Sequence, residues 1–76
     1  MTDITYEVWV LGYDKYQNIT DFDLFIKDFE DKEEAIKFAE KYYYKETLPK
    51  GVCYYEVVVE TVVNNSNIET VYGRLV

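Results

Sequence analysis

Apolar and polar residues alternate with a period of two in the first part of the chain. From Ile4 to Leu11, one side carries Ile, Tyr, Val and Val, and the other carries Thr, Glu, Trp and Leu. This period is typical of a β-strand, whose successive side chains point to opposite faces. Residues 12–18 contain the turn formers Gly, Asp and Asn, and alternation resumes between Asp21 and Lys27. The pattern predicts a β-hairpin.

A helical pattern follows the predicted hairpin. Asp31, with Glu34 three residues later, forms a capping box at a helix N-terminus. On a helical wheel one stripe is apolar and consists of Ala35, Ile36, Phe38, Ala39, Tyr42 and Tyr43. Two of the three consecutive tyrosines are therefore expected to pack against a sheet, and Tyr44 is expected in water at the helix end. Pro49 and Gly51 are predicted to end the helix.

A second hairpin is predicted after the helix. Residues 52–63 are rich in β-branched side chains, and 68–76 return after the polar turn 64–67. The face expected to pack on the helix carries Cys53, Tyr55, Val57, Val59, Thr61 and Val63. We expect Cys53 to be a small buried hydrophobic residue. The chain is thus predicted to be a single α+β domain, residues 1–76, of ββαββ order, with a four-stranded antiparallel sheet and one helix packed on one face.

The opposite face of this sheet is also expected to carry apolar residues. The fourth strand adds one of two sets according to the register of its hairpin, either Ile68 and Tyr72 or Val71 and Leu75. Uncovered apolar patches tend to mark interfaces. A homodimer is therefore predicted, with the candidate interface residues Trp9, Tyr54, Val58, Val62 and Tyr72.

Charge changes this picture by indicating the kind of partner. The 76 residues contain 15 acids and 8 bases, a net charge of −7, which repels nucleic acids and anionic membranes. Seven acids and two lysines between Asp21 and Glu34 give this segment a charge of −5. A basic host protein is the expected partner, and the same charge is also explained by solubility alone. The candidate partner-binding residues are Asp21, Asp23, Asp28, Glu30 and Glu33, with the aromatic anchors Tyr13, Tyr16 and Tyr44.

Residues that carry most enzyme chemistry are missing from the sequence. It has no histidine, one cysteine and three isolated glycines, so it offers no nucleophilic triad, zinc site or phosphate-binding glycine loop. We therefore predict a binding protein that is not an enzyme, with no catalytic residue, metal or cofactor. Because no secretion leader and no apolar run of about 20 residues occurs, a cytoplasmic protein outside the membrane is expected.

A small-molecule ligand is the alternative to a protein partner. Exposed tyrosine rings could stack on a base, and cations could meet a phosphate. The candidates for this role are Tyr13, Tyr44, Lys45 and Arg74. For Arg74 the competing interpretation is a cross-strand ion pair with Glu56 or Glu60.

The chain as a whole resembles the small, acidic, single-domain proteins of bacteriophages and mobile elements, including anti-CRISPR and other counter-defence proteins. The resemblance lies in size, charge, the ββαββ pattern and the segments YEVWVLGYD, EEAIKFAEKYYY and YYEVVVETVV. It implies an inhibitor that covers a basic, nucleic-acid-binding surface, or a homo-oligomeric sponge that sequesters a nucleotide signal, in the cytoplasm of the host cell. A small regulatory or structural protein remains a further alternative.

Overall fold

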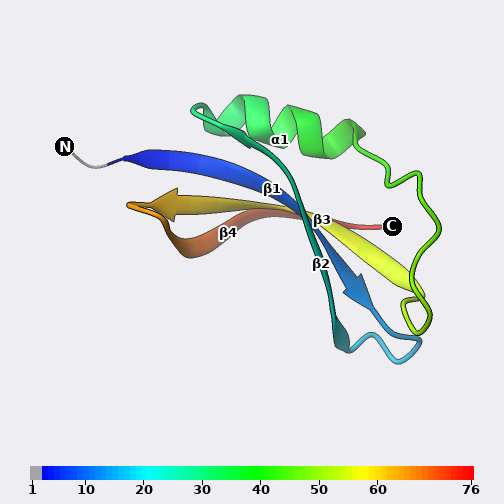
Figure 1. The fold of residues 1–76 in the computed structure, drawn as a ribbon. Coiled ribbons are helices and arrows are strands. Elements are labelled where there is room, and N and C mark those ends of the chain that lie inside the picture. The colour runs from blue at the N-terminus through cyan, green and yellow to red at the C-terminus, as the bar shows by residue number, and fades with distance from the viewer. Residues whose placement is uncertain (1–2) are drawn as a thin grey trace.

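The computed structural model describes residues 3–76, which form one four-stranded sheet and one helix. The elements are β1 (Ile4–Tyr13), β2 (Ile19–Phe29), α1 (Lys32–Lys41), β3 (Tyr54–Val63) and β4 (Ser66–Leu75). The strands are antiparallel in the order β2-β1-β3-β4, and α1 lies on one side of the sheet (Figure 1). The predicted α+β fold of ββαββ order is confirmed.

The core lies between α1 and the two central strands. Val8 and Val10 of β1 pair with Val59 and Val57 of β3, and all four are fully buried. On the helix the buried residues are the two alanines Ala35 and Ala39, whose small side chains let the helix approach the sheet closely. Of the residues predicted to face the helix from the third strand, Tyr55, Val57 and Val59 do belong to this core.

The turn between β3 and β4 sets the starting register of the second hairpin. Asn64 and Asn65 join β3 to β4 with φ angles of 50° and 69°, the left-handed pair that a two-residue type I′ turn requires. Irregularities after Val59 and after Thr61 then shift the register of β4. Tyr72 therefore pairs with Val59 in place of Val57. Both valines belong to the core, so Tyr72 packs on the helix side. The prediction that Tyr72 belongs to an interface on the opposite face was therefore wrong.

The helix begins as predicted and ends earlier than predicted. The Asp31 carboxylate accepts a hydrogen bond from the Glu34 backbone N–H at 3.1 Å. The last helical residue is Lys41, and Tyr42 already has an extended backbone. Beyond this point side chains alternate in and out: Tyr43 is 58% exposed, whereas the Tyr44 ring packs edge-on against those of Phe22 and Tyr55. The prediction that Tyr43 packs on the sheet and Tyr44 stands in water was therefore wrong. The helical wheel was extended over residues whose backbone is not helical.

Arg74 of β4 explains where the helix ends. Its cross-strand partner is Val57, which places Arg74 on the helix side of the sheet. There its guanidinium donates hydrogen bonds to the backbone carbonyls of Ala39, at 3.0 Å, and of Tyr42, and lies over the Tyr43 ring. A cation bound to the last carbonyls of a helix satisfies acceptors that have no partner within the helix. Neither the predicted ligand role nor the ion pair with Glu56 or Glu60 fits this position.

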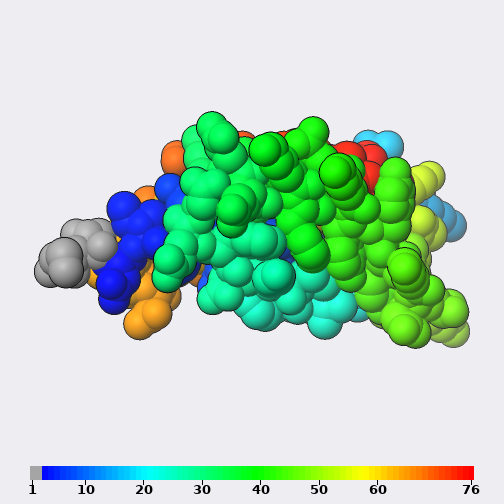
Figure 2. All heavy atoms as spheres, turned by 90° about the horizontal axis from the view of Figure 1, so that it is seen from above, coloured from blue at the N-terminus to red at the C-terminus, as the bar shows by residue number. Residues whose placement is uncertain are grey.

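Figure 2 looks at the molecule from the helix side. The helix and the following linker cover the middle and one end of the sheet, whereas the start of β1 and the β3–β4 turn project beyond the helix. Cys53 is exposed, so the prediction of a buried cysteine was wrong. The predicted strand 52–63 begins only at Tyr54, which leaves Cys53 in the linker. No helix within residues 3–76 has the length and apolar character needed to span a membrane.

Candidate protein-interaction face

The side of the sheet that points away from α1 carries no covering element within residues 3–76, and we call it the open face (Figure 1). The strand registers place on it Glu7, Trp9, Leu11 and Tyr13 of β1; Asp23, Phe25 and Asp28 of β2; Tyr54, Glu56, Val58, Glu60 and Val62 of β3; and Asn67, Thr70, Gly73 and Leu75 of β4. Aromatic and aliphatic side chains thus lie among carboxylates on β1, β2 and β3.

Trp9 lies at the centre of the open face. It pairs with Phe25 on β2 and with Val58 on β3. The Trp9 and Phe25 rings meet edge to face, with centroids 5.6 Å apart. Phe25 is 46% exposed and Trp9 is half-buried, so both rings present accessible apolar surface. Large, rigid aromatic side chains of this kind supply much of the energy of protein interfaces.

The valines of the open face offer much less surface than the sequence suggested. Val58 and Val62 are only 2% and 5% exposed within a single chain. A second copy could bury these two valines little further, so they would contribute little to the predicted homodimer interface. Tyr54, at 41% exposure, and Trp9 remain accessible members of the predicted set.

Three carboxylates form a row across the open face. Glu7 pairs directly with Asp28 on β2 and with Glu60 on β3. The Asn67 amide donates to Glu7 at 3.3 Å and to Glu60 at 2.5 Å, and the Trp9 indole N–H donates to Glu7 at 2.9 Å. Like charges directly opposite each other destabilise a sheet. Neutral donors therefore bind Glu7 and Glu60 and leave the charge of the row unchanged.

Basic side chains lie elsewhere in the molecule. The chain has eight Lys and Arg residues, all within the part that the structure describes, and none takes an open-face position in the strand registers. Lys27 pairs with Val8 and extends over the Phe29 and Phe38 rings on the helix side, as Arg74 does over Tyr43. The others belong to the β1–β2 turn, α1 or the linker. The open face therefore presents apolar surface within a field of a single sign.

The acidic segment of residues 21–34 is not one surface. Asp23 and Asp28 lie on the open face, opposite Leu11 and Glu7. The other predicted partner-binding acids go elsewhere: Asp21 lines a hollow beside residues 49–52, Glu30 lies between β2 and α1, and Glu33 is on the helix. Sequence reasoning grouped these acids by proximity in the chain, whereas strand pairing groups Asp28 with the more distant Glu7 and Glu60.

At one end of the open face Tyr13 and Glu56 form a polar pair in apolar surroundings. The Tyr13 hydroxyl donates a 2.7 Å hydrogen bond to Glu56 Oε1, which raises the pKa of the tyrosine, as burial and the carboxylate charge also do. A hollow of about 200 Å³ lies here, lined by Tyr13, Gln17, Glu56 and Leu75, and we call it the Glu56 hollow. Tyr16 is 72% exposed in the adjacent turn.

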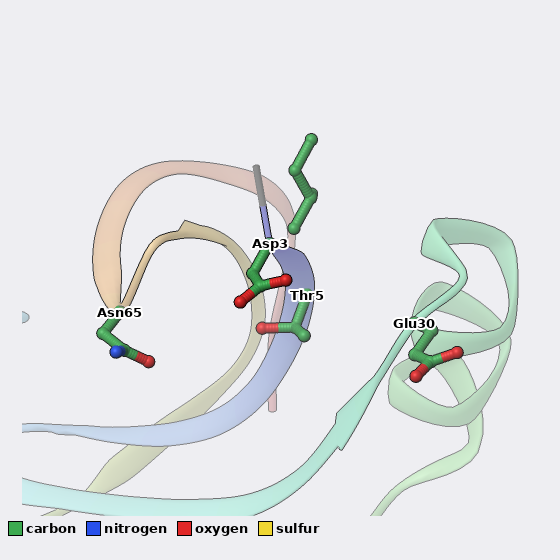
Figure 3. A pocket seen from close by; sticks show the side chains of 5 residues that line it. Asp3, Thr5, Glu30 and Asn65 are labelled. Carbon is green, nitrogen blue, oxygen red and sulfur yellow. The ribbon is translucent and has the colours of Figure 1, made fainter. Parts of the chain in front are cut away.

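A second, more polar hollow of about 420 Å³ lies at the opposite end of the sheet, lined by Asp3, Ile4, Thr5, Glu30 and Asn65. Figure 3 shows Asp3 and Thr5 close together on the start of β1, with Asn65 on one side and Glu30 across the hollow, beside the start of α1. Within residues 3–76 no group of three or more His, Cys, Asp or Glu side chains is arranged to hold a metal ion.

The residues predicted for a small-molecule site do not come together. Tyr13 is on the open face, Tyr44 packs on the helix side and Arg74 binds the helix end. Lys45 instead lines a hollow of about 380 Å³ with Phe38, Lys41, Tyr42 and Tyr43.

Comparison of the chain with protein-family models, with curated proteins and with solved structures found no match.

Proposed function

We propose that this protein is a non-catalytic binding protein that covers a basic surface of another protein with its open face. One observation carries the proposal: aromatic surface at Trp9 and Phe25 lies among carboxylates of three strands, and the registers place no basic side chain of residues 3–76 beside it. A face of this composition suits a partner rich in lysine and arginine, because complementary potentials speed association and exclude other partners.

The charges and the rings would contribute in different ways. The row Asp28, Glu7 and Glu60 would attract a basic partner at long range and raise the association rate, an effect that salt screens. Trp9 and Phe25 would provide the apolar contact that slows dissociation. A cationic partner would also relieve the repulsion within the carboxylate row, which neutral donors leave in place.

A phage-type counter-defence inhibitor is the biological setting that we propose for this chemistry. Proteins that handle nucleic acids bind phosphates with exposed lysine and arginine side chains. The open face would compete with nucleic acid for those side chains in the cytoplasm of the host cell. Binding without turnover would suffice for such inhibition.

Capture from a bacterial lysate tests the proposal when two matched variants are compared. The first removes three of the five negative charges of the open face with Asp23→Asn, Asp28→Asn and Glu60→Gln, and keeps Glu7 and Glu56. The second variant removes an equal number of negative charges outside the open face, with Glu40→Gln on α1, Glu46→Gln in the linker and Glu69→Gln on the helix side of β4. We expect wild type and the second variant to retain the same basic proteins and the first variant to lose them. Equal loss from both variants would reduce the interaction to net charge and would contradict the proposal.

A nucleotide sponge is the second candidate function, and one observation favours it. The hollow beside the helix end combines Lys41 and Lys45 with the exposed Tyr43 ring. The negative end of the helix dipole at this position opposes anion binding, so we rank this function second. Mass spectrometry of small molecules released by heat from the same captured samples tests it, and a nucleotide at equal molar amount would support it.

A further inference from the structure

The Glu56 hollow differs from the rest of the open face because its carboxylate has apolar neighbours. Glu56 pairs with Leu11 on one side and with Leu75 on the other. Asp28, Glu7 and Glu60 instead stand next to each other, and Asp23 pairs with Leu11 at the edge of the sheet. An ion pair formed next to apolar side chains and partly shielded from water is stronger than one in open solvent.

The Glu56 carboxylate is held in a fixed position by two features. Its Oε1 accepts the 2.7 Å hydrogen bond from the Tyr13 hydroxyl. Its Oε2 lies over the backbone of Gly73, where an added Cβ would be 2.6 Å from that oxygen. The absence of a side chain at residue 73 therefore makes room for the carboxylate. A pre-positioned acceptor loses less side-chain entropy when a ligand binds.

Aromatic and aliphatic surface surrounds this carboxylate. Tyr54 pairs directly with Tyr13, which puts both rings on the open face, and Tyr54 is 41% exposed. Leu75, which lines the hollow, is 57% exposed. A flat cation can stack on a tyrosine ring while its aliphatic stem lies along a leucine.

We propose that the Glu56 hollow is a specific site for one arginine side chain of the basic partner. The guanidinium would bond to the Glu56 carboxylate and stack on the neighbouring tyrosine rings, and the methylene stem would contact Leu75. Arginine fits better than lysine because its planar group can donate two parallel hydrogen bonds to a carboxylate and stack at the same time. This inference rests on the proposed function, since it names the strongest single contact on the open face.

Titration calorimetry with a nona-arginine peptide tests the site, with nona-lysine as the charge-matched probe. Glu56→Gln and Glu60→Gln each remove one negative charge from the open face, but only the first lies in the hollow. Glu56→Gln should weaken nona-arginine binding about tenfold, the effect of losing one charge-assisted hydrogen bond. Glu60→Gln should weaken it less than about threefold, the small effect expected of a charge that lies outside the hollow. For nona-lysine the two variants should differ little.

Gly73→Ala provides a second test that leaves the charge unchanged. The new methyl group would displace the Glu56 carboxylate, so nona-arginine binding should again weaken about tenfold by the same physical reasoning. Circular dichroism would verify that the variant folds, and Tyr13→Phe, which removes the orienting hydroxyl, is the substitute if it does not.

The outcomes separate this inference from the proposed function. Equal weakening by Glu56→Gln and Glu60→Gln would overturn the arginine site and leave the open face as a diffuse acidic surface. If neither variant changes nona-arginine binding, the peptide binds elsewhere on the molecule. That result would overturn the arginine site and also the proposed function of the open face.

Discussion

Replacing Arg74 by methionine should destabilise the protein strongly, although Arg74 lies on an edge strand. The substitution keeps an unbranched apolar side chain of similar length and removes the guanidinium that binds the Ala39 and Tyr42 carbonyls. A hydrogen bond from a charged donor contributes about 1.5–3 kcal/mol. The same guanidinium nitrogen donates to both carbonyls, and Nε is buried with no partner within residues 3–76, which offsets part of the gain. We therefore count one such hydrogen bond, about 2 kcal/mol.

The loss of a cation at the helix C-terminus adds about 0.3–1 kcal/mol, so the expected total is about 2–3 kcal/mol. A domain of 76 residues has a free energy of unfolding of about 4–11 kcal/mol, so the melting temperature should fall by roughly 10–20 °C. Urea unfolding followed by circular dichroism and by the fluorescence of the single tryptophan, Trp9, measures the change. Lys37→Met, which removes an exposed cation from the middle of α1, is the matched control and should cost under about 0.5 kcal/mol. An Arg74→Met protein as stable as this control would refute the assignment of Arg74 as the anchor of the helix end.

Three further predictions concern the carboxylate row, the Tyr13 hydroxyl and the tyrosine run. Glu60→Gln should raise the free energy of unfolding by about 0.2–1 kcal/mol, because it removes a like-charge pair, while it weakens binding to a basic partner; a loss of stability in urea unfolding would count against the row. The raised pKa of Tyr13 means that the folded state favours the protonated phenol, so this contribution is complete below pH 10 and is lost as the pH rises through the higher folded pKa. Alkaline unfolding curves should therefore show a smaller loss of stability in Tyr13→Phe than in wild type, and equal losses would exclude the linkage. Tyr44→Ala should cost about 3 kcal/mol and Tyr43→Ala under about 1 kcal/mol, and the reverse order in thermal melts would contradict the extended backbone after Lys41.

Much of the fold could be predicted because it depends on local patterns. The alternation in β1 and β3 identifies their core-facing sides, and the Asp31 capping box locates the start of α1. The end of α1 could not be predicted in this way. It depends on Arg74, which is more than 30 residues away in the chain and reaches the helix only because β4 pairs with β3.

The candidate site was less predictable because it depends on strand register. Asp28 was identified from the acidic segment, but its neighbours on the open face are Glu7 and, one strand further, Glu60. The sequence does show Glu7 and Glu60 at polar positions of two predicted strands. Only the pairing of β1 with both β2 and β3 brings them into one row with Asp28. The placement of Tyr72 failed for the same reason, since the polar residues 64–67 did not show in the sequence which two of them form the turn and so which register β4 takes.

Binding of a basic partner to the open face can be mapped residue by residue from the backbone-amide chemical shifts of the ¹⁵N-labelled protein. Nona-arginine would be added at low salt, and the titration repeated at high salt. We expect shifts of backbone amides in β1 and β3, centred on Glu7, Trp9 and Glu56, that shrink as salt screens the carboxylates. Shifts confined to α1 and the linker, with the amides of Glu7 and Glu56 unchanged, would contradict it.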